Sequence, residues 1–201
     1  MRYGMLIDLR KCVGCGACTV ACRAENGTPA GISFNKLKKY EVGKYPTAKM
    51  KSLPLPCMHC KIAPCVTVCP SRATVKNDEG IVTVDTKQCM GCRACIMACP
   101  YESRQFVWDL KTYYEDQNAT PFEKKKYVNF EKGTVAKCVF CIERIELGEK
   151  NACVHTCPAN CRFFGDLDDP ESEISKLISQ HGAIPLRGEL RTEPSVFYIW
   201  G

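Results

Sequence analysis

The chain has 201 residues, 17 of them cysteine, and its formal net charge is +6. This length fits one large domain or two small ones, and so many cysteines indicate a disulfide scaffold, a zinc protein or a cluster protein. No apolar run reaches the roughly 18 residues of a membrane helix, so the sequence predicts no membrane-spanning segment.

The chain is expected to open with a strand. Met1–Leu9 alternates apolar and polar residues and lacks the apolar core of a signal peptide, so no signal peptide is expected. Tyr3–Asp8 is therefore predicted to be a strand, and Phe163–Leu167, late in the chain, is its expected partner.

Four groups of four cysteines follow one another along the chain. They are Cys12, Cys15, Cys18 and Cys22 (C-x2-C-x2-C-x3-C); Cys57, Cys60, Cys65 and Cys69 (C-x2-C-x4-C-x3-C); Cys89, Cys92, Cys95 and Cys99 (the first spacing again); and Cys138, Cys141, Cys153 and Cys157 (C-x2-C-x11-C-x3-C). Proline follows the last cysteine in every group except the first, where Arg23 takes its place. The first and third groups form an internal repeat, with Gly14 and Gly91 at equivalent positions.

The segments around the third group predict a hairpin and a connection. Thr74–Lys76 and Ile81–Asp85 are expected to be short strands around a turn at 77–80. Gln105–Phe130 shows no clear periodicity and is interpreted as an inserted connection.

After the fourth group the sequence predicts a helix and an apolar ending. Asp169 is the expected N-cap, with Pro170 at the first helical position and Gly182 as the stop. The last residues, Pro194–Trp200, are too apolar for a free tail and are expected to pack on this protein or on a partner.

The cysteine spacings indicate iron–sulfur clusters. A cubane needs four thiolates, and in two-cluster ferredoxins a C-x2-C-x2-C-x3-C-P run gives its first three cysteines to one cluster and its fourth to the other. A disulfide framework does not explain four recurrences each of C-x2-C and C-x3-C, and 17 is an odd number. Structural zinc sites usually stop at two C-x2-C knuckles. Zinc is therefore the weaker alternative, to be tested by colour, because cluster protein is brown.

Other polar residues do not indicate an active site. His59, inside the second group, is expected to hydrogen-bond a cluster sulfur or to face a partner, and Cys161 is expected to be a small buried residue without a ligand role. No P-loop, G-x-S-x-G or G-x-G-x-x-G motif occurs, so the sequence predicts electron conduction without a catalytic site.

The net charge of the chain changes when clusters bind. An oxidised 4Fe–4S core with its thiolates carries roughly −2, so four clusters would change the net charge from +6 to roughly −2. The basic excess therefore does not indicate a nucleic-acid partner.

Four segments resemble a known family. MRYGMLIDLRKCVGCGAC, PCMHCKIAPCVTVCPS, CMGCRACIMACPY and CPANCRFFGDLDDPESEIS are similar to the iron–sulfur subunits of the dimethyl sulfoxide reductase family of molybdopterin oxidoreductases. The GDLDDPESEIS segment and the VFYIW ending look most like the polysulfide, thiosulfate and arsenate reductase branch.

The resemblance implies four clusters with crossed ligand sets. They would be held by Cys12, Cys15, Cys18 and Cys157; by Cys22, Cys138, Cys141 and Cys153; by Cys57, Cys60, Cys65 and Cys99; and by Cys69, Cys89, Cys92 and Cys95. Nitrate-reductase relatives have Trp at the position of Cys92 and a three-iron cluster, so cysteine here implies that all four clusters are 4Fe–4S.

The resemblance also implies the fold and the partners. The expected fold class is α+β, with two ferredoxin-like 4Fe–4S units, one inserted into the other, and long connecting loops. The boundaries would be 1–52 and 128–169 for the split unit, 53–105 for the inserted unit, 106–127 for the connection, and 170–201 for a C-terminal helix and docking tail.

The role that the resemblance implies is the transfer of electrons between a molybdopterin (Mo or W) catalytic subunit and a quinone-interacting membrane-anchor subunit in anaerobic respiration. A diffusible multi-cluster ferredoxin is the alternative. Membrane association on the extracytoplasmic face, by co-export with the catalytic subunit, is expected, with the cytoplasmic face as the alternative.

Overall fold

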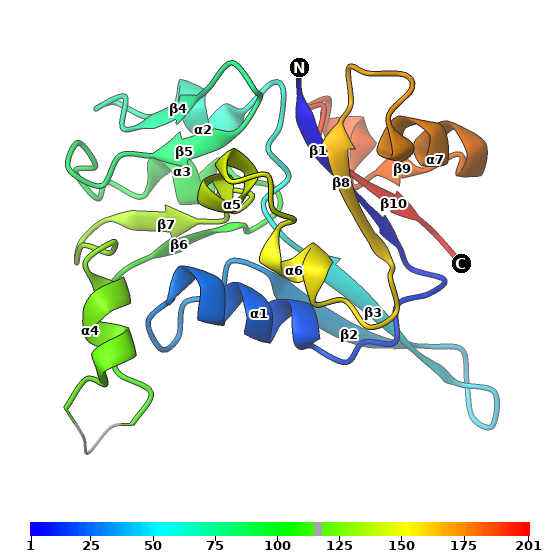
Figure 1. Ribbon diagram of the computed structural model, residues 1–201, viewed down its shortest axis with the longest axis horizontal. Helices are drawn as coiled ribbons and strands as arrows, with labels where there is room; N and C mark the ends of the chain where they lie inside the picture. Colours follow the sequence, from blue (N-terminus) through cyan, green and yellow to red (C-terminus); the bar gives the residue numbers. More distant parts are fainter. Residues whose placement is uncertain (115–117) are drawn as a thin grey trace.

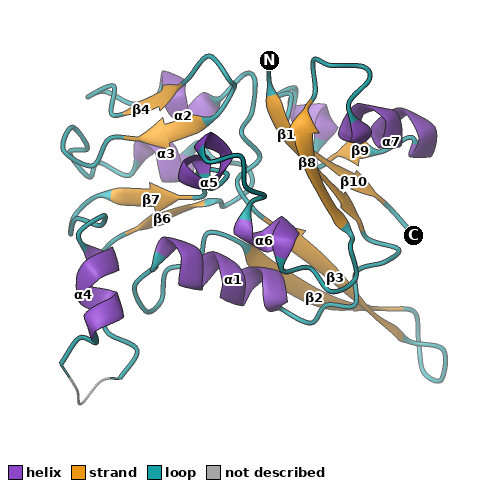
Figure 2. Ribbon diagram, viewed as in Figure 1, coloured by secondary structure: helices purple, strands orange, loops and turns teal. Residues whose placement is uncertain are grey.

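A computed structural model describes residues 1–114 and 118–201, so 115–117 of the predicted connection lie outside the described residues. Short helices alternate with small sheets (Figures 1 and 2). The elements are β1 Tyr3–Asp8, α1 Ala17–Asn26, β2 Lys36–Val42, β3 Lys49–Leu55, α2 Pro64–Thr67, β4 Thr74–Lys76, β5 Val82–Val84, α3 Ala94–Met97, β6 Arg104–Phe106, α4 Pro121–Tyr127, β7 Val135–Lys137, α5 Ile142–Glu146, α6 Ala152–His155, β8 Arg162–Asp166, α7 Glu173–His181, β9 Ile184–Pro185, η1 Gly188–Leu190 and β10 Val196–Ile199.

The largest sheet joins the two ends of the chain. Its strand order is β8-β1-β10-β9, and β1 pairs antiparallel with β8 through registers such as Met5 with Phe164. The expected partnership of the first strand with a late one is therefore confirmed. On its other side β1 pairs parallel with β10, where Met5 lies opposite Val196. Val196 and Tyr198 are fully buried, so this part of the apolar ending packs on the protein's own sheet.

Three two-stranded sheets complete the strand content of the described residues. The hairpin predicted around 77–80 is confirmed as β4–β5, and its turn is stabilised where Ile81 N–H donates to Asn77 Oδ1 at 2.8 Å. The β2–β3 hairpin, which the sequence did not predict, is mostly exposed at its tip and buried at its base near Leu55. The third sheet pairs β6 with β7, which joins the segment after the third cysteine group to the segment before the fourth.

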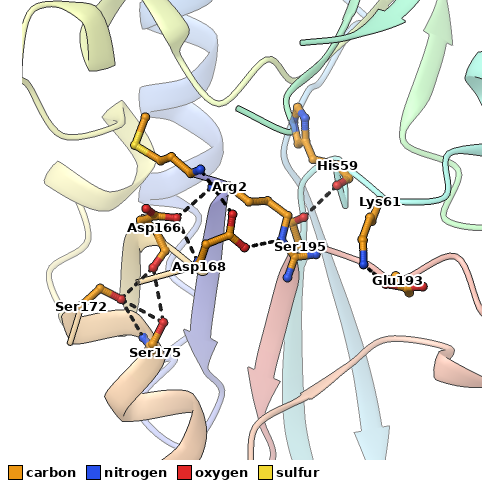
Figure 3. Close-up of polar contacts among 10 residues, drawn as sticks. Arg2, His59, Lys61, Asp166, Asp168, Ser172, Ser175, Glu193 and Ser195 are labelled. Atoms are coloured by element: carbon orange, nitrogen blue, oxygen red, sulfur yellow. Dashed lines mark hydrogen bonds and ion pairs between the residues drawn. The ribbon is translucent and has the colours of Figure 1, made fainter. Parts of the chain in front are cut away.

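Helix α7 begins later than the sequence predicted. Its N-cap is Ser172, whose Oγ accepts from Ser175 N–H at 3.2 Å and donates to the Asp166 carbonyl at 2.7 Å (Figure 3). Asp169 is not the cap, because its Oδ1 accepts from Glu171 N–H within the preceding turn. The predicted stop at Gly182 is confirmed, with a left-handed φ of 58°.

The described part of the predicted connection contains two regular elements. Strand β6 lies at its start, and α4 begins behind a capping box in which Thr120 and Glu123 satisfy each other's backbone N–H groups. Threonine followed three residues later by glutamate was the sequence signal for this helix.

The cysteine-bearing helices pack in two pairs. Helix α1 contacts α6, and α2 contacts α3. In Figure 1 the β4–β5 and β6–β7 strands with α2 and α3 lie toward one end of the molecule, and the large sheet with α7 lies toward the other. The main core, which includes Met5, Met58, Phe140 and Tyr198, spans the region between them.

Hydrogen bonds tie the large sheet to the second cysteine group. Just before β10, Ser195 N–H donates to the Met58 carbonyl at 2.8 Å, and its Oγ donates to the His59 carbonyl at 2.9 Å (Figure 3). Lys61 forms an ion pair with Glu193 at 3.1 Å alongside. The C-terminal strand therefore positions the loop that carries Cys57 and Cys60.

Candidate metal centres

Each C-x2-C loop turns through a left-handed residue before its second cysteine. These residues are Gly14, His59, Gly91 and Phe140, with φ values of 65°, 42°, 70° and 55°. The turn curls the backbone around the first sulfur, as where Phe140 N–H donates to Cys138 Sγ at 3.4 Å. The local chain in all four groups is therefore shaped to wrap a sulfur-ligated group.

Short helices carry the later cysteines of each group. Helix α1 contains Cys18 and Cys22, while α2, α3 and α6 contain Cys65, Cys95 and Cys153 respectively. In α2, α3 and α6 the last cysteine of the group follows the helix. Pairing α1 with α6 and α2 with α3 brings the first group to the fourth and the second group to the third.

Two cavities are lined by cysteines from the first and fourth groups. One cavity is lined by Cys12, Cys15, Cys18 and Cys157, and also by Cys161. The other cavity is lined by Cys22, Cys138, Cys141 and Cys153. The fourth cysteine of each group thus faces three cysteines of the other group.

The second and third groups also lie close together, because α2 contacts α3. Burial raises the pKa of Cys60 to about 12, and the neighbouring thiols of Cys57, Cys65 and Cys99 add to that rise. Burial likewise raises the pKa of Cys95, with contributions from Cys89 and Cys69. Cys92 lies in the same loop as Gly91 and is exposed.

Burial differs among the four cysteine sets that the resemblance implies. We call the sets that contain Cys22 and Cys57, in which five of eight cysteines are buried, the inner sets, and those that contain Cys12 and Cys89 the outer sets. Cys22, Cys138 and Cys153 are buried in one inner set, and Cys57 and Cys60 are buried in the other. The two exposed cysteines, Cys15 and Cys92, belong one to each outer set, and Cys95 is the one buried cysteine of the outer sets. Burial is the main cause of the raised pKa of Cys138, and the neighbouring Cys57 raises it further. A cysteine of one inner set therefore lies near a cysteine of the other.

The donor chemistry suits iron–sulfur clusters. All seventeen cysteines are free, and sulfur-only ligand sets are typical of such clusters. Burial raises the pKa of Cys141 to about 11, so its thiolate needs positive charge nearby, which cluster iron provides. Within 1–114 and 118–201, no group of three or more His, Cys, Asp or Glu residues is placed to hold a single metal ion.

His59 and Cys161 occupy buried positions beside these sets. His59 is 1% exposed and therefore does not face a partner; its Nδ1 accepts from Val82 N–H at 3.0 Å, and its ring stacks on Phe140 at 3.8 Å. Cys161 is 3% exposed, in line with the small buried residue that the sequence predicted, and its Sγ lies 3.4 Å from Cys157 Sγ.

Three buried cations near the cysteines were not predicted from the sequence: Arg104, Lys137 and Arg162. The sequence signal that could have identified the two arginines is their spacing. Each lies five residues after the last cysteine of its group, in CPYESR and CPANCR.

These paired helices, wrapped sulfurs and all-cysteine sets define an iron–sulfur protein of the two-cluster ferredoxin class. Family models agree with this assignment: two models described as "4Fe-4S dicluster domain" match the chain, one over 48–115 and 109–167 and the other over 11–73.

Characterised relatives identify the family. The chain is 40% identical to the B subunit of the selenate reductase of Mesobacillus selenatarsenatis (99% of this chain, 72% of the relative). It is 41% identical to the B subunit of the tetrathionate reductase of Salmonella typhimurium (98% and 72%). It is 38% identical to the arsenate respiratory reductase iron–sulfur subunit of Shewanella sp. (99% and 96%). The chain belongs to the iron–sulfur subunits of the molybdopterin reductases, which are electron-transfer subunits of anaerobic respiration.

Among the described residues, no helix has the length and apolar character needed to cross a membrane.

Proposed function

We propose that this chain carries four 4Fe–4S clusters and relays electrons between a molybdopterin (Mo or W) catalytic subunit and a quinone-interacting membrane-anchor subunit. Bound clusters of this kind accept and donate single electrons. The chain's own task is to hold them, exclude water and present both ends to partners. No catalytic role is proposed for it.

We propose four ligand sets of four cysteines each. The first is Cys12, Cys15, Cys18 and Cys157; the second is Cys22, Cys138, Cys141 and Cys153; the third is Cys57, Cys60, Cys65 and Cys99; and the fourth is Cys69, Cys89, Cys92 and Cys95. The cavities and thiol neighbourhoods of these residues support the assignment.

We also propose that the second and third groups form a ferredoxin-like unit inserted into a split one. The boundaries are 53–105 for the inserted unit and 1–52 with 128–169 for the split unit. The contacts of α1 with α6 and of α2 with α3 support this division.

The burial gradient carries the relay proposal. The outer sets each include an exposed cysteine, whereas most cysteines of the inner sets are buried. Exposed apolar side chains adjoin both outer sets, with Val13 72% and Met97 87% exposed. Apolar surface at both ends suits two fixed partners and disfavours a diffusible ferredoxin, which is the alternative.

The proposed location follows from the partners. The first set would face the catalytic subunit and the fourth the membrane anchor, an order that the family resemblance implies. We propose membrane association on the extracytoplasmic face after export of a folded complex, because clusters are inserted in the reducing cytoplasm. Attachment at the cytoplasmic face is the alternative, and protease treatment of spheroplasts distinguishes the two.

Purification under anaerobic conditions tests the proposal. A chain with four cubanes is brown and contains about sixteen irons. A tagged chain is expected to copurify with a catalytic subunit that contains Mo or W. A colourless zinc-containing product, or an iron-loaded chain that always purifies alone, would overturn the proposal.

A further inference from the structure

Three buried side chains carry positive charge without a compensating carboxylate. Arg104, Lys137 and Arg162 are only 4%, 3% and 4% exposed. In the part of the chain that the structure describes, none of them forms an ion pair. Burying an unpaired cation is strongly unfavourable. A source of negative charge other than Asp or Glu is therefore required nearby.

Two of these cations stand directly opposite each other. Arg104 and Lys137 are register partners in the β6–β7 pair, an arrangement that is unfavourable for like charges. Nη1 of Arg104 donates to Thr74 Oγ1 at 3.1 Å, whereas its buried Nη2 has no partner among the described residues. Lys137 Nζ donates to the carbonyls of Val82 and Cys138.

Arg162 lies between the first and second ligand sets. Its Nη2 is 3.5 Å from Sγ of Cys18, which belongs to the first set, and 3.2 Å from Asn35 Oδ1. Burial raises the pKa of Cys153, in the second set, and Arg162 opposes that rise. Burial by itself would lower the pKa of Arg162. The negative charges of the Cys153 and Cys18 thiolates together have the larger effect, so the pKa of Arg162 is raised.

Lys137 directly precedes Cys138 of the second set and its Nζ donates to the Cys138 carbonyl. Arg104 lies opposite Lys137 in the β6–β7 pair, five residues after Cys99 of the third set. Burial raises the pKa of Cys138, in the second set, to about 12, and Lys137 opposes the rise. Burial also raises the pKa of Cys65, in the third set, against the opposing charges of Arg104 and Lys137. Arg104 further opposes the burial-driven rise in the pKa of Cys95, in the fourth set. Arg162 therefore acts on cysteines of the first and second sets, Lys137 on those of the second and third, and Arg104 on those of the third and fourth.

The two arginines occupy equivalent positions. CPYESR places Arg104 at the start of β6, and CPANCR places Arg162 at the start of β8. In both, the strand follows the last cysteine of the group at the same spacing. The duplicated placement indicates a function common to both helix pairs, because a chance surface charge would not be buried twice at one offset.

We propose that Arg162, Lys137 and Arg104 are charge-compensating residues, one at each gap of the relay, and that each raises the reduction potentials of the two clusters flanking it. The inference rests on the proposed ligand sets. Reduction adds one electron to an oxidised cluster, which takes its total charge from roughly −2 to roughly −3. A buried cation between two clusters stabilises the reduced form of both, since low-dielectric surroundings screen it little.

Redox titration of the loaded subunit, followed by electron paramagnetic resonance, tests this proposal. Arg162→Met is expected to lower the potentials of the first and second clusters, Lys137→Met those of the second and third, and Arg104→Met those of the third and fourth. The expected change is at least tenfold in each reduction equilibrium, which is about 59 mV for one electron. The clusters not flanking the substituted residue should stay unchanged.

Charge-retaining and exposed controls separate electrostatics from folding. Arg104→Lys and Arg162→Lys should keep near wild-type potentials, because the charge stays. Arg72→Met removes an exposed arginine three residues after Cys69 and should shift the fourth cluster far less than Arg104→Met does. If a methionine variant loses iron, the glutamine variant at that position replaces it, and the lysine variant must still match wild type.

Three outcomes would overturn the inference: equal shifts of all four clusters, no shift in any cluster, or lysine variants that behave like methionine variants. Fewer than four cubane signals in the wild-type titration would instead overturn the proposed function. Four signals without pairwise shifts would overturn the inference alone.

Discussion

At the residue scale, the left-handed turns of the C-x2-C loops decide how each first sulfur is wrapped. Gly91 combines a φ of 70° with close packing, because a Cβ there would lie 2.1 Å from the Gly133 carbonyl oxygen. Gly16, with a φ of 81°, has nothing within 4 Å of such a Cβ. Substitution of Gly16 therefore introduces backbone strain alone, whereas substitution of Gly91 introduces backbone strain and a steric clash.

We expect Gly91→Ala to destabilise the loaded protein more than Gly16→Ala. The left-handed conformation alone costs about 1–2 kcal/mol for alanine, and only Gly91→Ala must also displace a backbone oxygen. Thermal unfolding of the two variants beside wild type measures the difference. Equal losses of midpoint temperature would show that the Gly133 contact does not constrain the third cysteine group.

Cys161 tests the boundary between a ligand and its neighbour. Its Sγ lies 3.4 Å from Cys157 Sγ, yet the four ligand sets are complete without it. Cys161→Ala should keep the iron content of wild type, whereas Cys157→Ala should lose about four irons. Iron analysis of both variants decides the matter, and loss of a cluster in Cys161→Ala would place Cys161 among the ligands.

At the scale of elements, α7 depends on a cap made across the chain. Ser172 Oγ accepts from Ser175 N–H and also donates to the Asp166 carbonyl at the end of β8. Ser172→Ala should lower the free energy of unfolding by about 1 kcal/mol, and Asp169→Ala, at an exposed turn, should lower it less. Denaturant unfolding of the two variants measures this order. A larger loss from Asp169→Ala would restore Asp169 as the cap.

At the scale of the whole molecule, the crossed ligand sets make each helix pair a single structural unit. Cys22→Ser should damage the cluster of Cys138, Cys141 and Cys153, because Cys22 lines their cavity. Cys18→Ser should damage the cluster shared with Cys157 instead. The resonance spectra of the two variants should therefore lose different signals. Loss of the same signal in both would mean that the first group serves one cluster.

The sequence by itself determined the local features of this protein. The C-x2-C and C-x3-C spacings identify sulfur-wrapping loops and short helices, because both need only contiguous residues. The β4–β5 hairpin was predictable because its turn is stabilised by Asn77, within the turn itself. Gly182 ends α7 for an equally local reason, its left-handed conformation. The family followed from these motifs together.

Only the tertiary structure decided how these local pieces combine. Strand β10 became an inner strand because β1, at the opposite end of the chain, provides its pairing edge. Ser172 replaced Asp169 as the cap because the Asp166 carbonyl at the end of β8 accepts from its hydroxyl. Arg162 reaches Cys18 across 144 positions of the chain. Spacing cannot reveal such contacts, because they depend on which distant surfaces are buried together and on the charge that burial leaves uncompensated.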